Sequence, residues 1–200
     1  MNAMLQPIRY SPEDLSRIPN GNWYELVDGV LQEKHVSQLA SWVAGEILTT
    51  LRLHTRMTHQ GEVFTSDASY QCFPDRPRTL RKPDVSFVRR DRLPKRGPGA
   101  GNFLIAPDLA VEVISPNDEY EAVDAKISDY LSVKVPLIWI VCPNTRTVTI
   151  HRLDGSATRL QGDQEITGES VLPGFVSKIS AFYYPLPSST DADPENQPPV

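Results

Sequence analysis

The chain has few of the residues that build disulfide or zinc frameworks. Its two cysteines, Cys72 and Cys142, lie far apart and form no Cys-x-x-Cys motif. We therefore expect two buried thiols and no disulfide framework. Its four histidines contain no His-x-x-x-His pair, a common zinc-ligand spacing. The sequence thus gives no support to the disulfide-stapled and zinc-binding classes of small protein.

Long apolar runs and several common functional motifs are also absent. No apolar stretch reaches the ~18 residues that a membrane-spanning helix needs. Residues 1–10 lack the continuous apolar core of a secretory signal, so we expect a cytoplasmic protein with no membrane partner. The chain contains neither Gly-x-Ser-x-Gly nor Gly-x-Gly-x-x-Gly, which argues against a serine hydrolase and a dinucleotide-binding protein.

The overall composition is that of one globular domain. The chain has 200 residues, of which 40% are hydrophobic and 22% are charged. This length favours a single core, and we predict one domain over residues 1–184. From Pro185 onward, five prolines and small polar residues predict a disordered tail over residues 185–200.

Charge is distributed unevenly along the chain. The net charge of −5 argues against a protein that coats nucleic acid non-specifically. Nine basic residues nevertheless gather between positions 76 and 96, and such a run is either a phosphate-contacting patch or a solvated loop. The nine are Arg76, Arg78, Arg81, Lys82, Arg89, Arg90, Arg92, Lys95 and Arg96.

The first third of the chain predicts a helix start, a hairpin and a long helix. Ser11-Pro12-Glu13-Asp14 has the pattern of an N-cap followed by a first helical turn. Asp28-Gly29 separates the apolar runs 23–27 and 30–33, which predicts a hairpin. Apolar residues then recur at helical spacing, which predicts an amphipathic helix over about 35–56. They are Val36, Leu39, Ala40, Val43, Ile47 and Leu51.

The rest of the chain predicts strands interrupted by one helix. Apolar runs and turn signals predict strands over 62–66, 68–73, 85–88, 109–114, 137–142, 147–152 and 157–160. A helix is expected over about 118–133, with Ser115-Pro116-Asn117 ending the preceding strand and capping it. Pro173-Gly174 predicts a turn. The order favours an α/β or mixed α+β fold, with a sheet covered by helices.

Two carboxylates stand in or beside apolar strands. Glu112 interrupts the run from Leu109 to Ile114, and both faces of that strand are otherwise apolar. Asp84 directly precedes Val85-Ser86-Phe87-Val88. A carboxylate in a core strand is costly unless it is paired or binds a metal. Glu112 and Asp84 on neighbouring strands would suit a hard cation such as Mg²⁺ or Mn²⁺, although an edge strand or a structural ion pair would also explain Glu112.

Three further side chains are candidates for the same site. Lys126 shares a helical stripe with Val123, Ile127, Tyr130 and Leu131, so it either extends outward to solvent or points at an acid. Tyr130, one turn on, is a second candidate and equally an ordinary core residue. Glu25 is either a further ligand or a half-exposed strand residue. By contrast, Asp108 is expected at a strand entry and His35 at a helix start.

These segments together resemble the Uma-two family. The resemblance rests on four motifs within residues 7–184, in matching order: Tyr24-Glu25-Leu26-Val27-Asp28-Gly29, Lys82-Pro83-Asp84-Val85-Ser86-Phe87-Val88, Pro107-Asp108-Leu109-Ala110-Val111-Glu112-Val113-Ile114-Ser115-Pro116 and Lys126 to Trp139 followed by Leu172-Pro173-Gly174-Phe175. It implies a restriction-endonuclease-like fold of the PD-(D/E)XK superfamily. In that fold a central mixed sheet is flanked by helices, here with an N-terminal hairpin and a long helix.

The resemblance also implies a site and an activity. Asp84 and Glu112 correspond to the metal-binding acids, and Lys126 to a lysine drawn from the following helix. The lysine that the superfamily places two positions after the acid is Ile114 here. The expected function is a Mg²⁺-dependent endonuclease acting on nucleic acid, with DNA as the expected substrate and a homodimer as a possible assembly. The alternatives are an inactive binding module that retains the fold and a hydrolase of another phosphoester.

Overall fold

The computed structural model describes residues 8–35, 37–97 and 99–183. The N-terminal elements are α1 (Pro12–Leu15), the 3-10 turn η1 (Gly21–Trp23), the strands β1 (Tyr24–Val27) and β2 (Val30–Glu33), and the long helix α2 (Gln38–Thr58). The middle contains β3 (Gly61–Thr65), β4 (Val85–Arg89), η2 (Arg90–Arg92), β5 (Leu109–Val113) and α3 (Tyr120–Ser132). The C-terminal elements are β6 (Leu137–Cys142), β7 (Thr147–Arg152), β8 (Ala157–Gln161), β9 (Glu165–Gly168), β10 (Leu172–Lys178) and η3 (Ile179–Phe182).

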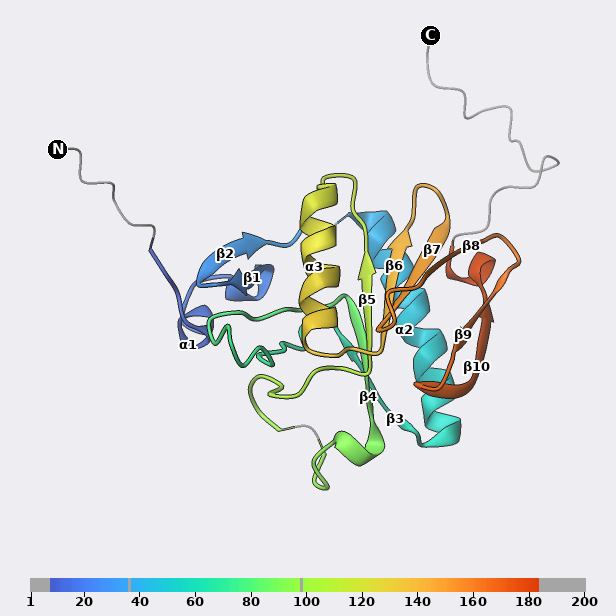
Figure 1. Cartoon of the computed structure of the whole chain (residues 1–200), viewed down its shortest axis with the longest axis horizontal. Helices are drawn as coiled ribbons and strands as arrows, with labels where there is room; N and C mark the ends of the chain where they lie inside the picture. The colour runs from blue at the N-terminus through green and yellow to red at the C-terminus, as the bar shows by residue number, and fades with distance from the viewer. Residues whose placement is uncertain (1–7, 36, 98, 184–200) are drawn as a thin grey trace, which may run out of the picture.

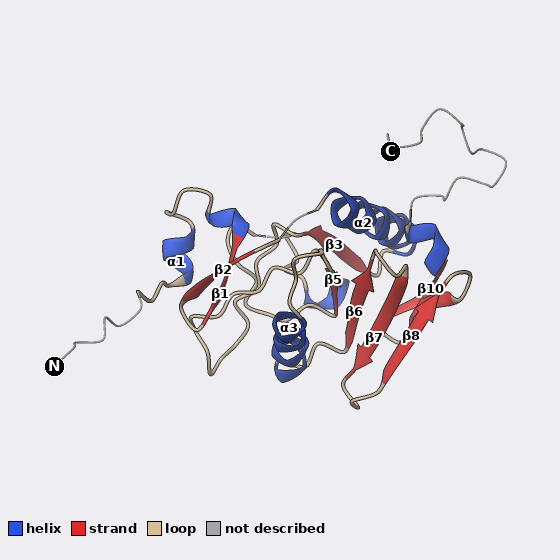
Figure 2. Ribbon diagram, turned by 90° about the horizontal axis from the view of Figure 1, so that it is seen from above, coloured by secondary structure: helices blue, strands red, loops and turns tan. Residues whose placement is uncertain are grey.

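Six strands form one mixed sheet with helices on both faces. Its order is β3-β4-β5-β6-β7-β8, and the β5–β6 pair is parallel while the other pairs are antiparallel. Two parallel neighbours need a crossover connection, which α3 supplies. The helices α2 and α3 lie on opposite faces of this sheet, and the β1–β2 hairpin stands beside it (Figure 1, Figure 2). The predicted mixed sheet flanked by helices, with a hairpin and a long helix before it, is confirmed.

The two faces of the sheet differ in what they bury. Side chains alternate along a strand, so Leu109, Val111 and Val113 of β5 join the core beneath α2. Ala110 of the same strand packs in the cluster beneath α3. Glu112 lies on that second face as well, because its carboxylate is hydrogen-bonded to side chains of α3. The single strand β5 therefore carries the main apolar core and a buried charge on opposite sides.

Local sequence signals account for several elements directly. The predicted N-cap is confirmed, because Ser11 and Asp14 form a reciprocal capping box at the start of α1. The predicted hairpin is confirmed too, and Asp28 and Gly29 adopt positive φ angles of 49° and 84° at its turn. None of the helices in the described ranges is long and apolar enough to cross a membrane.

Two predicted features of the sheet are wrong. Residues 68–73 form no strand, and Tyr70 makes only isolated bridges, to Arg81 and Phe103. Their apolar side chains are buried by loop packing, which needs no ladder of hydrogen bonds. Pro173 and Gly174 form no turn between elements but lie within β10, where the pairing with β9 shifts register. Gly174 has a φ of 79°, which accommodates this irregularity in the strand.

The predicted helix starts also need correction. Helix α2 begins at Gln38 with Ser37 as N-cap, so His35 precedes the helix and does not start it. Leu39 was predicted to face inward but is 42% exposed. Helix α3 begins at Tyr120, and its N-cap Glu119 makes no side-chain capping bond. Residues 115–118 instead form a turn that keeps Asn117 out of the helix. Val36 and the predicted tail over 185–200 lie outside the described residues.

Candidate active site

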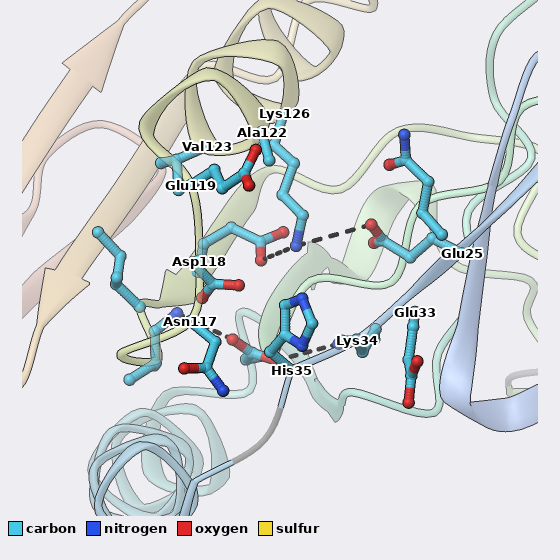
Figure 3. Close-up of a pocket in the computed structure, with 15 residues that line it drawn as sticks. Glu25, Glu33, Lys34, His35, Asn117, Asp118, Glu119, Ala122, Val123 and Lys126 are labelled. Carbon is cyan, nitrogen blue, oxygen red and sulfur yellow. Dashed lines mark hydrogen bonds and ion pairs between the residues drawn. The ribbon is translucent and has the colours of Figure 1, made fainter.

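A pocket of about 340 Å³ opens where the hairpin meets the α3 face of the sheet. Four separate segments line it: the hairpin with the link to α2, the start of β4, the end of β5, and the first half of α3 with the turn before it. The four residues predicted for a site, Glu25, Asp84, Glu112 and Lys126, all line this pocket. Figure 3 shows Lys126 reaching from α3 across the pocket towards Glu25 on the hairpin.

Lys126 and Glu112 form the central contact. Lys126 Nζ lies 2.7 Å from Glu112 Oε2 and 3.6 Å from Glu25 Oε2. The hydroxyl of Tyr130, one helical turn further along α3, donates to Glu112 Oε1 at 2.5 Å. Lys126 thus reaches the strand acid from the helix, and the side chain of Ile114 packs in the apolar cluster beneath α3.

Asp84 comes beside Glu112 because of strand register. Val85 pairs with Val111, so one residue further along the antiparallel pair Asp84 stands opposite Glu112. Asp84 Oδ2 accepts a hydrogen bond of 2.8 Å from the Val113 N–H. Its other oxygen lies 3.0 Å from Lys34 Nζ, on the link after the hairpin. The pocket therefore contains two acid–lysine pairs side by side.

Glu25 is held by a buried network behind the pocket. Its side chain is 2% exposed, and its two oxygens accept from the Lys82 N–H at 2.6 Å and from Arg81 Nη1 at 2.9 Å. Arg81 in turn donates from Nε and Nη2 to Asp129 Oδ2 at 2.8 and 2.6 Å. Because Asp129 belongs to α3, this network fastens the hairpin to the helix that carries Lys126.

Burial shapes the charge state of each central group. Burial raises the pKa of Glu112, Lys126 partly offsets that rise, and the nearby carboxylates Asp84 and Glu25 add to it. Burial alone would lower the pKa of Lys126, but Glu112 and Glu25 hold it well above its ordinary value. For Glu25, burial acts to raise the pKa, and the charges of Lys126, Arg81 and Lys34 outweigh it, so the pKa is lowered. Lys126 therefore stays cationic, and Glu112 is the carboxylate most ready to take a proton.

The basic stretch contributes mainly to structure. Five of its arginines, Arg76, Arg81, Arg89, Arg90 and Arg92, form ion pairs with nearby acids. Buried Lys82 donates instead to the carbonyls of Gly21 and Asn22. This favours a packed, ion-paired segment over a phosphate-contacting patch for these six residues.

Several further residues in or near the pocket take their positions from strand pairing or long-range contacts. Asp108, expected at a strand entry, is buried and accepts from the Arg89 N–H at 2.9 Å, outside the pocket. Lys34 was missed, although a signal exists: Glu25 pairs with Gln32 across the hairpin, and Lys34 lies two residues further along the same face. His35 also lines the pocket. The Arg81–Asp129 contact has no sequence signal, since it joins residues 48 positions apart.

The donor atoms are compatible with a hydrated divalent cation. Among residues 8–35, 37–97 and 99–183, no three His, Cys, Asp or Glu side chains are grouped so that they could hold a metal ion. Both oxygens of Asp84 and of Glu112 accept a hydrogen bond, but each oxygen keeps a second lone pair. Mg²⁺ is commonly held by one or two carboxylates and completes its shell with water and phosphate oxygens. Asp84 and Glu112 match that donor set.

Comparisons with known proteins agree with this architecture. The model of the Uma2 family, described as "Putative restriction endonuclease", matches residues 12–181. The structure is similar to the crystal structure of a putative nuclease belonging to DUF820 from Anabaena variabilis, with a TM-score of 0.74 and 20% sequence identity. The match covers 86% of this chain and 96% of that one, and at this identity it shows a shared fold. No curated protein matches the chain.

Proposed function

We propose a function for this chain from one established premise: it belongs to the Uma2 family, whose description is putative restriction endonuclease. The proposal is a metal-dependent nuclease that hydrolyses phosphodiester bonds, with DNA as substrate. The observation that carries it is the Lys126 ammonium, 2.7 Å from Glu112 in a pocket shared with Asp84. A fixed cation beside two carboxylates suits a reaction in which negative charge builds up on a phosphate.

The residues of the proposed site have distinct parts in this chemistry. Asp84 and Glu112 would hold Mg²⁺ or Mn²⁺, which when bound lowers the pKa of a coordinated water and neutralises charge on the scissile phosphate. Lys126 remains protonated at neutral pH, so it acts as a hydrogen-bond donor and a positive charge, not as a base. Tyr130 orients the Glu112 carboxylate from the other side. Glu25 provides a second carboxylate for the Lys126 ammonium, at 3.6 Å.

The central test is cleavage of supercoiled plasmid DNA in the presence of Mg²⁺. We expect nicking by the wild-type protein and a loss of about 100-fold or more in Lys126→Ala, because one such donor contributes ~3 kcal/mol to transition-state stabilisation. Asp84→Ala should also abolish nicking. Lys178→Ala is the matched control, since Lys178 is an exposed lysine on β10, outside the pocket. Nicking at the wild-type rate by both pocket variants would refute the proposed site.

Metal binding is tested without reference to activity. A ligand that binds the folded protein raises its melting temperature, so Mn²⁺ or Mg²⁺ should stabilise the wild type and stabilise Glu112→Gln far less. The rival function is a binding module that has lost the chemistry. It is favoured by Ile114 at the usual lysine position and by carboxylates whose oxygens already have protein partners. No thermal shift in the wild type, with retained DNA binding, would support that rival.

A further inference from the structure

A second hollow continues directly from the candidate active site. It has a volume of about 560 Å³ and shares five lining residues with the first pocket: Glu33, Lys34, His35, Asp84 and Val113. Its remaining walls come from η1, from the N-terminal half of α2 and from the residues after β3. Figure 3 shows His35 beside Lys34, with its ring in the first pocket, and both residues also line the second hollow. Because the two hollows share these walls, a ligand bound over Asp84 in the first pocket can extend into the second.

The lining of the second hollow suits an uncharged, flat ligand. Lys34 is the only lysine or arginine among the described residues that line it, and it is already paired with Asp84. Glu33 and Asp67 add negative charge, which disfavours a phosphate there. Asn22, Ser41 and Ser66 supply hydrogen-bonding groups, while Ala40 and Ala44 are small and apolar. A volume of this size is typical of a small-molecule pocket and accommodates a nucleobase with its sugar.

An exposed tryptophan stands at the rim of this hollow on a rigid support. Trp23 is 61% exposed and lines the hollow. Its turn is held closely against α1, because a Cβ on Gly21 would lie 1.9 Å from the Leu15 carbonyl oxygen. The buried ammonium of Lys82 donates to the Gly21 and Asn22 carbonyls at 3.3 Å each. Because the backbone that carries Trp23 is fixed in this way, a ligand that stacks on the indole has only side-chain rotation to restrict.

We propose that the second hollow binds the base of an unpaired nucleotide next to the scissile phosphate, with the Trp23 indole as its stacking surface. The assignment of the neighbouring phosphate to the first pocket rests on the proposed function. A base inside a duplex is already stacked on its neighbours, so the strand must be single or the base must leave the helix. The hollow thus narrows the substrate class to single-stranded DNA and to duplexes in which a nucleotide is unpaired or leaves the stack.

The test measures binding without cleavage, using the full-length protein with Ca²⁺ in place of Mg²⁺. The probes are a short single-stranded oligothymidylate and an oligomer of the same length built from abasic nucleotides. We expect Trp23→Ala to weaken oligothymidylate binding by about fivefold to a hundredfold, the range that loss of one base–aromatic stack produces. Binding of the abasic oligomer should be unchanged, and Trp23→Phe should retain most of the affinity. Trp42→Ala is the matched control, because Trp42 is 46% exposed on α2 and does not line the second hollow.

The outcomes separate this proposal from the proposed function. Equal losses on the base-bearing and abasic oligomers, equal effects of Trp23→Ala and Trp42→Ala, or no binding by the wild type would each overturn the subsite. Base-dependent binding through Trp23 by a protein that cleaves no DNA with Mg²⁺ would leave the subsite standing while the proposed function fails. If the wild type and Trp23→Ala cleave single-stranded DNA equally and bind it equally, the proposed function stands and the subsite fails.

Discussion

The two faces of the central sheet perform different tasks with the same strands. On the α2 face, Val111 and Trp139 are fully buried among other apolar side chains. On the α3 face, Glu112 is just as deeply buried but contacts Lys126 and Tyr130. Stability on the first face comes from removing apolar surface from water, and a cavity in this close-packed core would be destabilising. The second face holds charges whose burial is costly, and it persists because each charge has a partner.

This difference shows which substitutions should affect only one face of the sheet. A strand alternates its side chains, so a substitution at one position of β5 affects one face and leaves the neighbouring position to serve the other. The apolar face fixes the position of the sheet, and the charged face uses that rigidity to hold Lys34 and Lys126 beside Glu25, Asp84 and Glu112 in one pocket. The following variants test whether the two faces are as separate as this comparison implies.

The largest loss of stability is expected on the apolar face. Trp139→Ala removes a fully buried indole that packs against Phe175, 6.0 Å away between ring centroids. We expect the free energy of unfolding to fall by about 3–5 kcal/mol, as for other large-to-small core changes. Urea denaturation measures this loss, with exposed Trp42→Ala as the control that should change stability by less than about 1 kcal/mol. A loss below 1 kcal/mol for Trp139→Ala would contradict the assignment of this face as the main core.

A slightly smaller loss of stability is expected when the buried ion-pair network on the charged face loses its arginine. Arg81→Met leaves the buried carboxylates Glu25 and Asp129 without their shared partner. We expect a loss of about 3 kcal/mol in unfolding free energy, because removing one partner of a buried ion pair is strongly destabilising, although Arg76 still contacts Asp129 and Lys126 still contacts Glu25. Arg90→Met is the matched control, since the Arg90–Glu62 pair is exposed and such pairs contribute less than about 1 kcal/mol. Equal effects of the two variants would show that the buried network does not hold the hairpin to α3.

The smallest effect on stability is expected when both members of the central pair are replaced. Lys126→Met with Glu112→Gln removes the buried charges together, and such exchanges are often neutral or stabilising by about 1 kcal/mol or more. Nicking activity should be lost in the same protein. Retained stability with lost activity would therefore separate the two tasks of β5. A loss above 2 kcal/mol in urea denaturation would instead assign the pair a structural task.

The single variant Glu112→Gln gives a pH test of the central carboxylate, because it keeps Lys126, whose charge lowers the pKa of Glu25. The folded-state pKa of Glu112 is raised, mainly by burial, so its contribution to stability is greatest below its ordinary pKa and falls as pH rises through the raised value. Lys126 stays cationic in both proteins throughout this acidic window, because its pKa is raised above an already basic value. The stability of the wild type relative to Glu112→Gln should thus decrease as pH increases from below about 4.5 towards neutrality. A constant difference across this range would show that burial does not raise the pKa of Glu112.

Much of the site was accessible from the sequence because its energetic signals are local. Glu112 is recognisable because both faces of its strand are otherwise apolar, and Lys126 because it shares a helical stripe with Ile127 and Tyr130. The hairpin, β6 and β7 were predicted because turn residues and apolar alternation act over a few residues. The segment 68–73 misled because hydrophobicity reports burial, and loops such as that around Tyr70 are buried too.

The sequence by itself determined which residues are costly to bury and most of the segments that form strands and helices, since both depend on near neighbours in the chain. It also placed the chain in its family. Only the tertiary structure decided that Lys126 contacts Glu112, that Lys34 pairs with Asp84, and that Arg81 joins the hairpin to α3. These contacts bring together side chains 14 to 56 positions apart. Such pairs depend on sheet register and helix placement, which no local pattern encodes.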